Sequence, residues 1–272
     1  MIVRCVGGLF LIFLSADLSQ VESRIALAFT GDPEMLRLAN MKPYEYDQHT
    51  RNAALIFSCS EAEVTKDQRY LGKKAVHAAQ RGARGKKLSE ELLKDGYFMT
   101  EDQCDGFIMT YLAHHQPLQK FFRDVRTEIL EYRALTNTWG RFITYDYAIL
   151  SDDLYREGYS WRLQSEASDL LLQWGLIPIY AYTQMMARRP RMHVPVHDSL
   201  LLSCHPADAY YLADLIRLHI ERPRIYYNSE LTVPVEFELG SSWAAKHSFK
   251  KLPSEKEFTE AAYDCEGGND EK

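Results

Sequence analysis

Two aspartates, Asp17 and Asp198, lie at the ends of apolar segments and could act together as ligands for metal ions. Asp17 follows the apolar run 9–14, and Asp198 precedes a second apolar run, 200–202. Two divalent ions about 3.5–4 Å apart require shared anionic oxygen ligands, because these offset the repulsion between the ions. Carboxylates on adjacent strands of one sheet would meet that requirement. For these two segments taken alone, aspartates that only cap turns remain the alternative.

Between the two aspartates lies a strongly basic segment, residues 66–87, whose own sequence holds a single acid, Asp67. Four of its side chains recur at intervals of four residues and would share one face of a helix, here called the basic stripe: Arg69, Lys73, His77 and Arg81. Like charges at this spacing repel each other, so a stripe without acidic neighbours favours a bound anion such as a triphosphate. The alternative is a solvated basic face without a ligand.

The composition of the whole chain is that of a globular protein. With 272 residues, of which 46% are hydrophobic, the chain can bury a substantial core. Its formal net charge of −6 argues against nucleic-acid binding over the entire surface, although a local basic face stays compatible with it. The five cysteines have no C-x-x-C spacing and predict neither a disulfide framework nor a zinc site: Cys5, Cys59, Cys104, Cys204 and Cys265. A reducing cytosol fits this pattern best.

The N-terminus has some features of a secretory signal peptide, because a charged start is followed by the apolar run 5–14. This run is too short to span a membrane as a helix. Residues 9–14 fit a buried central strand equally well, and cleavage near Ala16 would cut into the segment that carries Asp17. We therefore expect a strand, a protein that is not secreted and no membrane partner.

The elements that must position these residues alternate in type along the chain. Apolar and alternating runs predict strands over 9–17, two short strands within 192–203 that meet at His197 and Asp198, a strand or hairpin over 138–149, and a last strand over 233–239. Helical spacing predicts helices over 20–30, 151–172, 178–188 and 206–220, and a mostly helical stretch over 47–133 with breaks at 82–85, 96 and 117. We expect the acidic end, 264–272, to be frayed.

Taken together, these segments resemble family A DNA polymerases, the group of bacterial DNA polymerase I and its phage relatives. Three motifs occur in the family's order: D-L-S-Q-V-E-S-R at 17–24 is similar to D-Y-S-Q-I-E-x-R, residues 69–82 are similar to the fingers-helix motif with R-x-x-x-K, and V-H-D-S at 196–199 is similar to V-H-D-E. Shorter matches lie at 47–49, 138–141, 164–169 and 234–243. The resemblance covers about residues 9–245.

The resemblance implies an α/β fold of the α+β kind, a polymerase palm with a small antiparallel sheet and a helical fingers subdomain. The palm would comprise residues 1–46 and 134–245, and the fingers 47–133 with their motif helix at about 66–82. Residues 246–272 would form an acidic C-terminal tail.

The resemblance also implies a role for each matched residue. Asp17, Asp198 and the backbone carbonyl of Leu18 would hold two Mg²⁺ ions, with Lys73 as a further catalytic residue in the addition of a dNTP to a primer 3′-hydroxyl. Glu22 would crowd the 2′ side of the sugar and favour deoxynucleotides. The residues implied to bind the dNTP are Gln20, Glu22, His49, Arg69, Lys73, His77 and Arg81. Those implied to bind primer and template DNA are Arg156, Gln164 and His197.

Four positions depart from the family pattern: Leu18 and Arg81 replace tyrosines, Ser199 replaces an acid, and Ser160 replaces an asparagine. About eight residues precede the first strand, so we expect the thumb and any exonuclease domain to be missing from this sequence, which would be a fragment or one half of a split polymerase whose partner supplies the thumb. The site of work would be a bacterial or phage-infected cytoplasm. Two alternatives stay open: a non-catalytic DNA-binding remnant or subunit of a split polymerase, and a single-subunit RNA polymerase, against which Glu22 argues.

Overall fold

The structure is a computed structural model that describes residues 11–146, 149–242 and 244–265. The first ten residues, which include Cys5 and most of the run that resembles a signal peptide, lie outside the described residues. The same holds for residues 147–148 of the expected hairpin, for Trp243 of the final motif match and for 266–272 of the acidic end.

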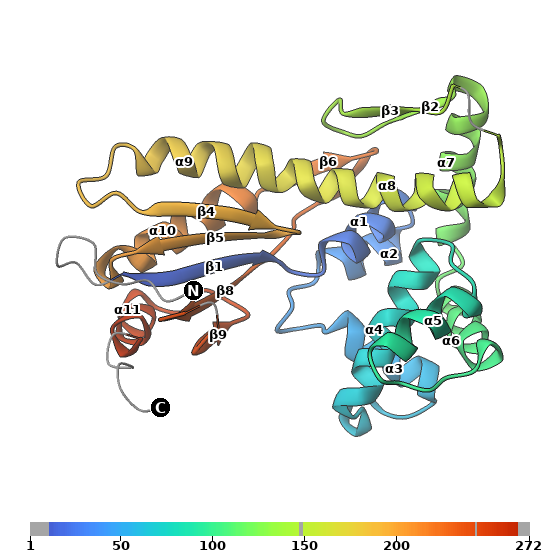
Figure 1. The fold of residues 1–272 in the computed structure, drawn as a ribbon, viewed down its shortest axis with the longest axis horizontal. Helices are drawn as coiled ribbons and strands as arrows, with labels where there is room; N and C mark the ends of the chain where they lie inside the picture. The colour runs from blue at the N-terminus through green and yellow to red at the C-terminus, as the bar shows by residue number, and fades with distance from the viewer. Residues whose placement is uncertain (1–10, 147–148, 243, 266–272) are drawn as a thin grey trace. The chain divides into compact units, whose positions relative to one another are not determined.

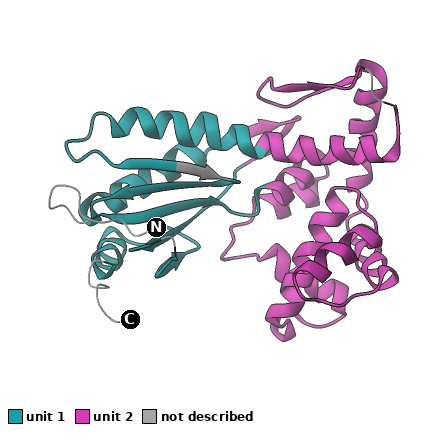
Figure 2. Cartoon of the chain, in the orientation of Figure 1, with its two compact units in different colours: residues 1–21, 167–223, 232–272 teal, residues 22–166, 224–231 magenta. Residues whose placement is uncertain are grey.

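The chain forms two compact units, each built from separate stretches of sequence (Figure 2). Unit 1 comprises residues 1–21, 167–223 and 232–272, and unit 2 comprises 22–166 and 224–231. Asp17 and Asp198 belong to unit 1, whereas the basic stripe belongs to unit 2. The palm and fingers boundaries expected from the sequence stay predictions.

Unit 1 is built on a five-stranded antiparallel sheet with the strand order β4-β5-β1-β8-β9 (Figure 1). The strands are β1 (Ile12–Leu18), β4 (Arg191–Val196), β5 (Ser199–Cys204), β8 (Val235–Gly240) and β9 (His247–Phe249). One face of β1 carries Ile12, Leu14 and Ala16, which are fully buried, and the other carries Phe13, Ser15 and Asp17. The position of β1 between β5 and β8 confirms the expectation of a central strand.

Three helices and one helical segment complete unit 1: the π-helical segment η2 (Leu171–Leu176), α9 (Ile177–Thr183), α10 (Pro206–Ile220) and α11 (Glu255–Asp264). Helix α10 begins as expected at Pro206, a residue favoured in the first helical turn, and packs Leu212 and Ile216 into the core. Helix α11 was not predicted. Its Phe258 is fully buried against Phe237 and Phe249, so the chain beyond Pro253 is ordered as far as Cys265.

Unit 2 is mainly helical. Its helices are α1 (Val21–Phe29), α2 (Pro33–Asn40), α3 (Gln48–Phe57), η1 (Glu61–Glu63), α4 (Lys66–Gln80), α5 (Gly85–Lys94), α6 (Glu101–His114) and α7 (Leu118–Tyr132). Side-chain caps explain several helix starts, since Thr65 and Thr100 each form a reciprocal capping box with a glutamine three residues on. Helix α8 (Asp152–Leu170) carries the chain from unit 2 into unit 1. Among the described residues, no helix combines the length and apolar character that crossing a membrane requires.

Two predictions of secondary structure were only partly right in their positions. Of the strand or hairpin expected over 138–149, strand β3 (Phe142–Thr144) lies inside the expected stretch, whereas its partner β2 (Ala134–Thr136) precedes it. The Asn137 side chain accepts hydrogen bonds from the backbone nitrogens of Trp139 and Arg141, which stabilises a turn rather than a strand. The helix expected over 178–188 ends at Thr183. A second small hairpin, β6 (Arg224–Tyr226) and β7 (Ser229–Leu231), was not predicted.

Candidate active site

Asp17 lies on β1, and Asp198 lies in the turn that leads into the adjacent strand β5. Asp17 is in register with Ser199 at the start of β5, and Asp198 occupies the turn between β4 and β5. The backbone nitrogen of Leu18 donates a hydrogen bond to the carbonyl oxygen of Asp198, with a distance of 3.0 Å between the two atoms. Both carboxylates are partly exposed. The adjacency on which the two-metal hypothesis depends is therefore present.

A further carboxylate, Glu236 on β8, lies directly opposite Asp17 and was missed by the sequence analysis. Residues opposite each other in an antiparallel pair project to the same face of the sheet. The hydroxyl of Ser19 donates a 2.6 Å hydrogen bond to Glu236 Oε1. Glu236 can be recognised as a neighbour of β1 only from the pairing of β8 with β1, because 218 positions of sequence separate it from Leu18, the last residue of β1.

The oxygen ligands at this edge fit a hard divalent cation, because Mg²⁺ is bound through one or two carboxylates that leave room for water and substrate oxygens. Asp17 and Asp198 supply two carboxylates, and Ser199 stands where a third would be expected. Among the described residues no set of three His, Cys, Asp or Glu side chains is arranged to hold a metal ion. The site thus fits ions that share ligands with a bound substrate.

The turns next to the aspartates contain two residues in the left-handed region. Gln20 has a φ of 54° and His197 has a φ of 55°. Such conformations are uncommon for residues other than glycine and persist where the surroundings enforce them. The Gln20 Oε1 atom is buried and has no hydrogen-bond partner in the part of the chain that the structure describes, whereas the His197 side chain is exposed.

In unit 2, Asp47 connects the start of α3 to the basic stripe on α4. Its side chain caps α3 by accepting hydrogen bonds from the backbone nitrogens of His49 and Thr50. Its other oxygen accepts a 2.9 Å hydrogen bond from Arg69 Nε. Burial alone would raise the pKa of Asp47, but the hydrogen bond and charge of Arg69 outweigh it, so the pKa lies below its usual value. Asp47, the first residue of the short sequence match at 47–49, therefore positions both His49 and Arg69.

Helices α3 and α4 approach each other closely at Gly72. A Cβ atom built there would lie 2.8 Å from the Cβ and 2.9 Å from the Cα of Ala53. This contact explains a glycine inside a helix, where it costs about 1 kcal/mol relative to alanine.

His49 is buried, His77 is half-buried, and their rings form an uncharged pair. Their ring centroids are 5.8 Å apart. Burial, aided by the neighbouring His77, lowers the pKa of His49 to about 3, and burial, aided by the Arg81 charge, lowers the pKa of His77 to about 4. At neutral pH both rings are therefore neutral and can each donate one N–H hydrogen bond.

The charges of the basic stripe are partly compensated within the fold, which corrects the expectation of a stripe without acidic neighbours. Arg69 pairs with Asp47, and Arg81 pairs with Glu22 at 2.6 Å. Neither acid is close to its partner in sequence, so a count of local charges missed them. Lys73 is exposed and has no carboxylate partner among the described residues.

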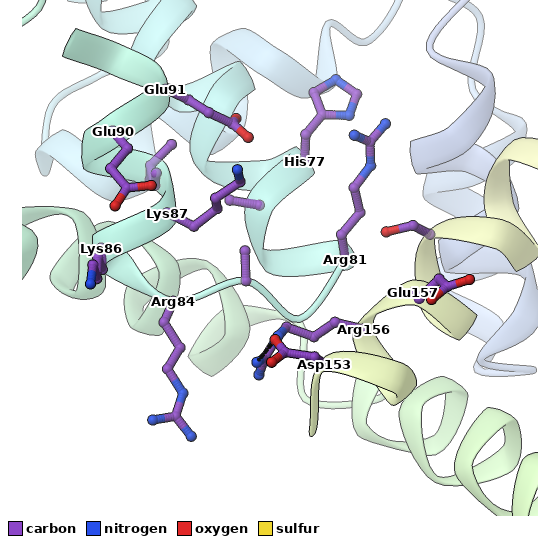
Figure 3. Close-up of a pocket in the computed structure, with 14 residues that line it drawn as sticks. His77, Arg81, Arg84, Lys86, Lys87, Glu90, Glu91, Asp153, Arg156 and Glu157 are labelled. Carbon is purple, nitrogen blue, oxygen red and sulfur yellow. Dashed lines mark hydrogen bonds and ion pairs between the residues drawn. The ribbon is translucent and has the colours of Figure 1, made fainter. Parts of the chain in front are cut away.

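A cavity of about 630 Å³ opens beside the C-terminal end of α4, between that end, the first turns of α5 and the start of α8. Figure 3 shows His77 and Arg81 extending side by side from α4, with Arg156 of α8 joined to Asp153 by an ion pair. The wall carries charges of both signs, with the basic side chains of Arg81, Arg84, Lys86, Lys87 and Arg156 and the acidic ones of Glu90, Glu91, Asp153 and Glu157. Arg156 shares a helix with Gln164, whose side chain is exposed.

Two other motif residues hold the fold rather than face a ligand. Arg24 is fully buried, and its guanidinium donates to the carbonyl oxygens of Ala39 and Met41 at the end of α2. Glu166 of α8 is also fully buried, and its Oε1 accepts hydrogen bonds from both the backbone nitrogen and the hydroxyl of Thr138. The contact between Glu166 and Thr138 joins two of the short sequence matches, those at 138–141 and 164–169.

A sequence profile of the DNA polymerase family A matches residues 7–245. The DNA polymerase of Bacillus phage SP01 is 28% identical over 250 residues, which are 87% of this chain and 26% of the phage protein. DNA polymerase I of Aquifex aeolicus is 22% identical over 85% of this chain and 39% of its own length. The chain therefore spans well under half of these curated relatives.

The fold is similar to that of a solved structure described as the POL domain of Pol1 from M. smegmatis in complex with DNA primer-template and dNTP. The TM-score is 0.73 at 22% identity, and the match covers 89% of this chain and 42% of the other. The family match covers the greater part of the chain and includes all three ordered motifs. The chain therefore belongs to DNA polymerase family A.

Proposed function

We propose that this chain is the core of a DNA-directed DNA polymerase, which adds dNTPs to a primer 3′-hydroxyl under the direction of a template. The observation that carries this proposal is the placement of Asp17 on β1 beside Asp198, which lies in the turn before the adjacent strand β5. The family of the chain supports the reaction class.

Asp17 and Asp198, with the Leu18 carbonyl, would hold two Mg²⁺ ions, and oxygen atoms are the ligands that such ions prefer. When bound, the ions would lower the pKa of the primer hydroxyl and neutralise the triphosphate and leaving pyrophosphate. Gln20 lies three residues after Asp17, and its buried, unpartnered oxygen suits a contact to a bound nucleotide.

The triphosphate would bind to Arg69 and Lys73 on α4, assisted by His49. The charge of Lys73 is exposed and has no carboxylate partner in the described residues, so the ammonium group is available to bind an anion. Asp47 already holds the Arg69 guanidinium in place, which reduces the entropy lost on binding. His49 is neutral and would donate a hydrogen bond rather than a charge. His77 would pack against the sugar and base.

Primer and template would contact Arg156, Gln164 and His197, and the basic side chains that line the cavity beside Arg156 suit a phosphodiester backbone. Contacts to phosphate and sugar carry no sequence information, as a copying enzyme requires. We also propose a second chain that supplies thumb or exonuclease elements. We place the protein in a bacterial or phage-infected cytoplasm, where these substrates occur.

The test is primer extension with Mg²⁺ by the full chain, alone and with a thumb-bearing fragment of a family A polymerase. Extension with dNTPs, lost in Asp198→Ala, supports the proposal. Efficient use of NTPs in place of dNTPs would instead favour the single-subunit RNA polymerase. No extension under either condition, together with retained DNA binding, would favour the non-catalytic subunit.

A further inference from the structure

Arg81 and Glu22 form an ion pair that joins the end of α4 to the first turn of α1. A terminal nitrogen of the Arg81 guanidinium lies 2.6 Å from Glu22 Oε2. The side chains are only partly exposed, 36% for Arg81 and 20% for Glu22. A charge-assisted hydrogen bond at this depth is shorter, stronger and less screened than a pair on the open surface.

A buried hydrogen-bond chain lies beside this ion pair. The Ser23 hydroxyl donates to Gln80 Oε1 at 3.0 Å, and Gln80 Nε2 donates to the Tyr111 hydroxyl at 2.9 Å. Consecutive residues of α1 thus contact consecutive residues at the end of α4. This double contact fixes the direction from which Arg81 approaches Glu22.

The backbone around Arg81 restricts the position of its side chain. The Arg81 N–H closes the last turn of α4 on the carbonyl oxygens of His77 and Ala79. Gly82 follows with a φ of +66°, and a Cβ atom there would lie 2.9 Å from the Tyr159 ring. The chain therefore turns sharply away after Arg81, and the side chain extends along the cavity wall beside His77 (Figure 3).

We propose that Arg81 is a positioning residue for sugar selection, which acts by holding the Glu22 carboxylate in one orientation. This inference rests on the proposed function and on the role that the family resemblance implies for Glu22, which is to crowd the 2′ side of the nucleotide sugar. A glutamate on a helix surface can otherwise rotate about three bonds and move out of the way of an added hydroxyl. With one oxygen held by Arg81, the carboxylate keeps its place, and a ribonucleotide must break a charge-assisted hydrogen bond in order to fit.

The test is single-nucleotide incorporation of dCTP and CTP by the full chain, with kcat and KM determined separately for each nucleotide. Arg81→Ala should lower the dCTP to CTP ratio of kcat/KM about tenfold, the weight of one charge-assisted hydrogen bond, chiefly by lowering the KM for CTP. Arg81→Lys should restore part of the ratio, because a lysine can still reach Glu22 with a charge. Arg37→Ala removes an exposed ion pair on α2 and should leave the ratio unchanged.

Coupling between the two residues gives the decisive comparison. Glu22→Ala alone and Glu22→Ala with Arg81→Ala should lose selectivity equally, because Arg81 acts only through Glu22. If Arg81→Ala unfolds at a lower temperature than wild type, Arg81→Gln, which keeps most of the packing, replaces it in the test. An unchanged ratio in an active Arg81 variant, or additive losses in the double variant, would overturn the inference alone. A wild-type chain that fails to incorporate dCTP would contradict the proposed function, and the inference with it.

Discussion

Asp47 connects the cap of α3 to the position of Arg69, since one of its oxygens caps α3 and the other accepts a hydrogen bond from Arg69 of α4. Asp47→Asn should keep the cap but lose the ion pair, whereas Asp47→Ala should lose both. We expect a loss of about 1 kcal/mol of unfolding free energy for Asn and about 1 kcal/mol more for Ala. Urea unfolding measures both, and the KM for dNTP should rise in each.

The lowered pKa of Asp47 also predicts a dependence on pH. A carboxylate whose pKa is depressed in the folded state stabilises the fold above its unfolded pKa, and this contribution disappears as the pH falls through the folded value. The stability advantage of wild type over Asp47→Asn should therefore shrink below about pH 4. A difference that stays constant from pH 7 to pH 3 would contradict the ion pair.

The neutral pair of His49 and His77 also predicts a loss of stability as the pH falls, but over a higher pH range. Their pKa values of about 3 and about 4 lie below that of an unfolded histidine, so the unfolded state takes up protons first as the pH falls. Each histidine should cost about 2 kcal/mol of stability between pH 7 and pH 5. His77→Phe should remove its share of this loss, as measured by denaturant unfolding at both pH values. An equal slope in the variant would show that His77 is not held neutral.

The contact between Thr138 and Glu166 should carry much of the attachment of the β2–β3 hairpin to α8. Glu166→Ala leaves two donors of Thr138 without their acceptor and should cost about 3 kcal/mol. Thr138→Ala removes only the hydroxyl and should cost about 1 kcal/mol. Thr144→Ala, an exposed position on β3, is the matched control and should have little effect on thermal unfolding. Equal stability of Glu166→Ala and wild type would contradict this role.

The two glycines Gly72 and Gly106 offer a matched test of helix packing. At Gly106 of α6 an added Cβ would meet no atom within 4 Å, so Gly106→Ala should stabilise the protein by up to about 1 kcal/mol. At Gly72 the added Cβ would collide with Ala53, so Gly72→Ala should destabilise it despite the better helix propensity. Melting temperatures that rise for both variants would show that α3 and α4 are not in close contact.

The sequence predicted those features that depend on local pattern, and the order of its motifs indicated the family. The apolar run before Asp17 predicted a central strand. The glycine and proline breaks between helical stretches predicted most helix ends. Partners that meet only through the fold were not predictable. Glu22 and Arg81 are 59 positions apart, and Glu236 faces Asp17 only because β8 pairs with β1. The first strand of the hairpin, β2, was missed because three residues are too few to show an alternating pattern.

The most direct test of the central claim is the rate of single-nucleotide incorporation as a function of Mg²⁺ concentration, in wild type and in Asp198→Asn. Asparagine keeps the shape of the side chain but removes the charge that a metal requires. The account predicts Mg²⁺-dependent incorporation by wild type, a loss of about 10³-fold in Asp198→Asn, and a normal rate in the control Asp214→Asn on α10. Equal rates in wild type and a well-folded Asp198→Asn would contradict the assignment of Asp17 and Asp198 as the metal-binding pair.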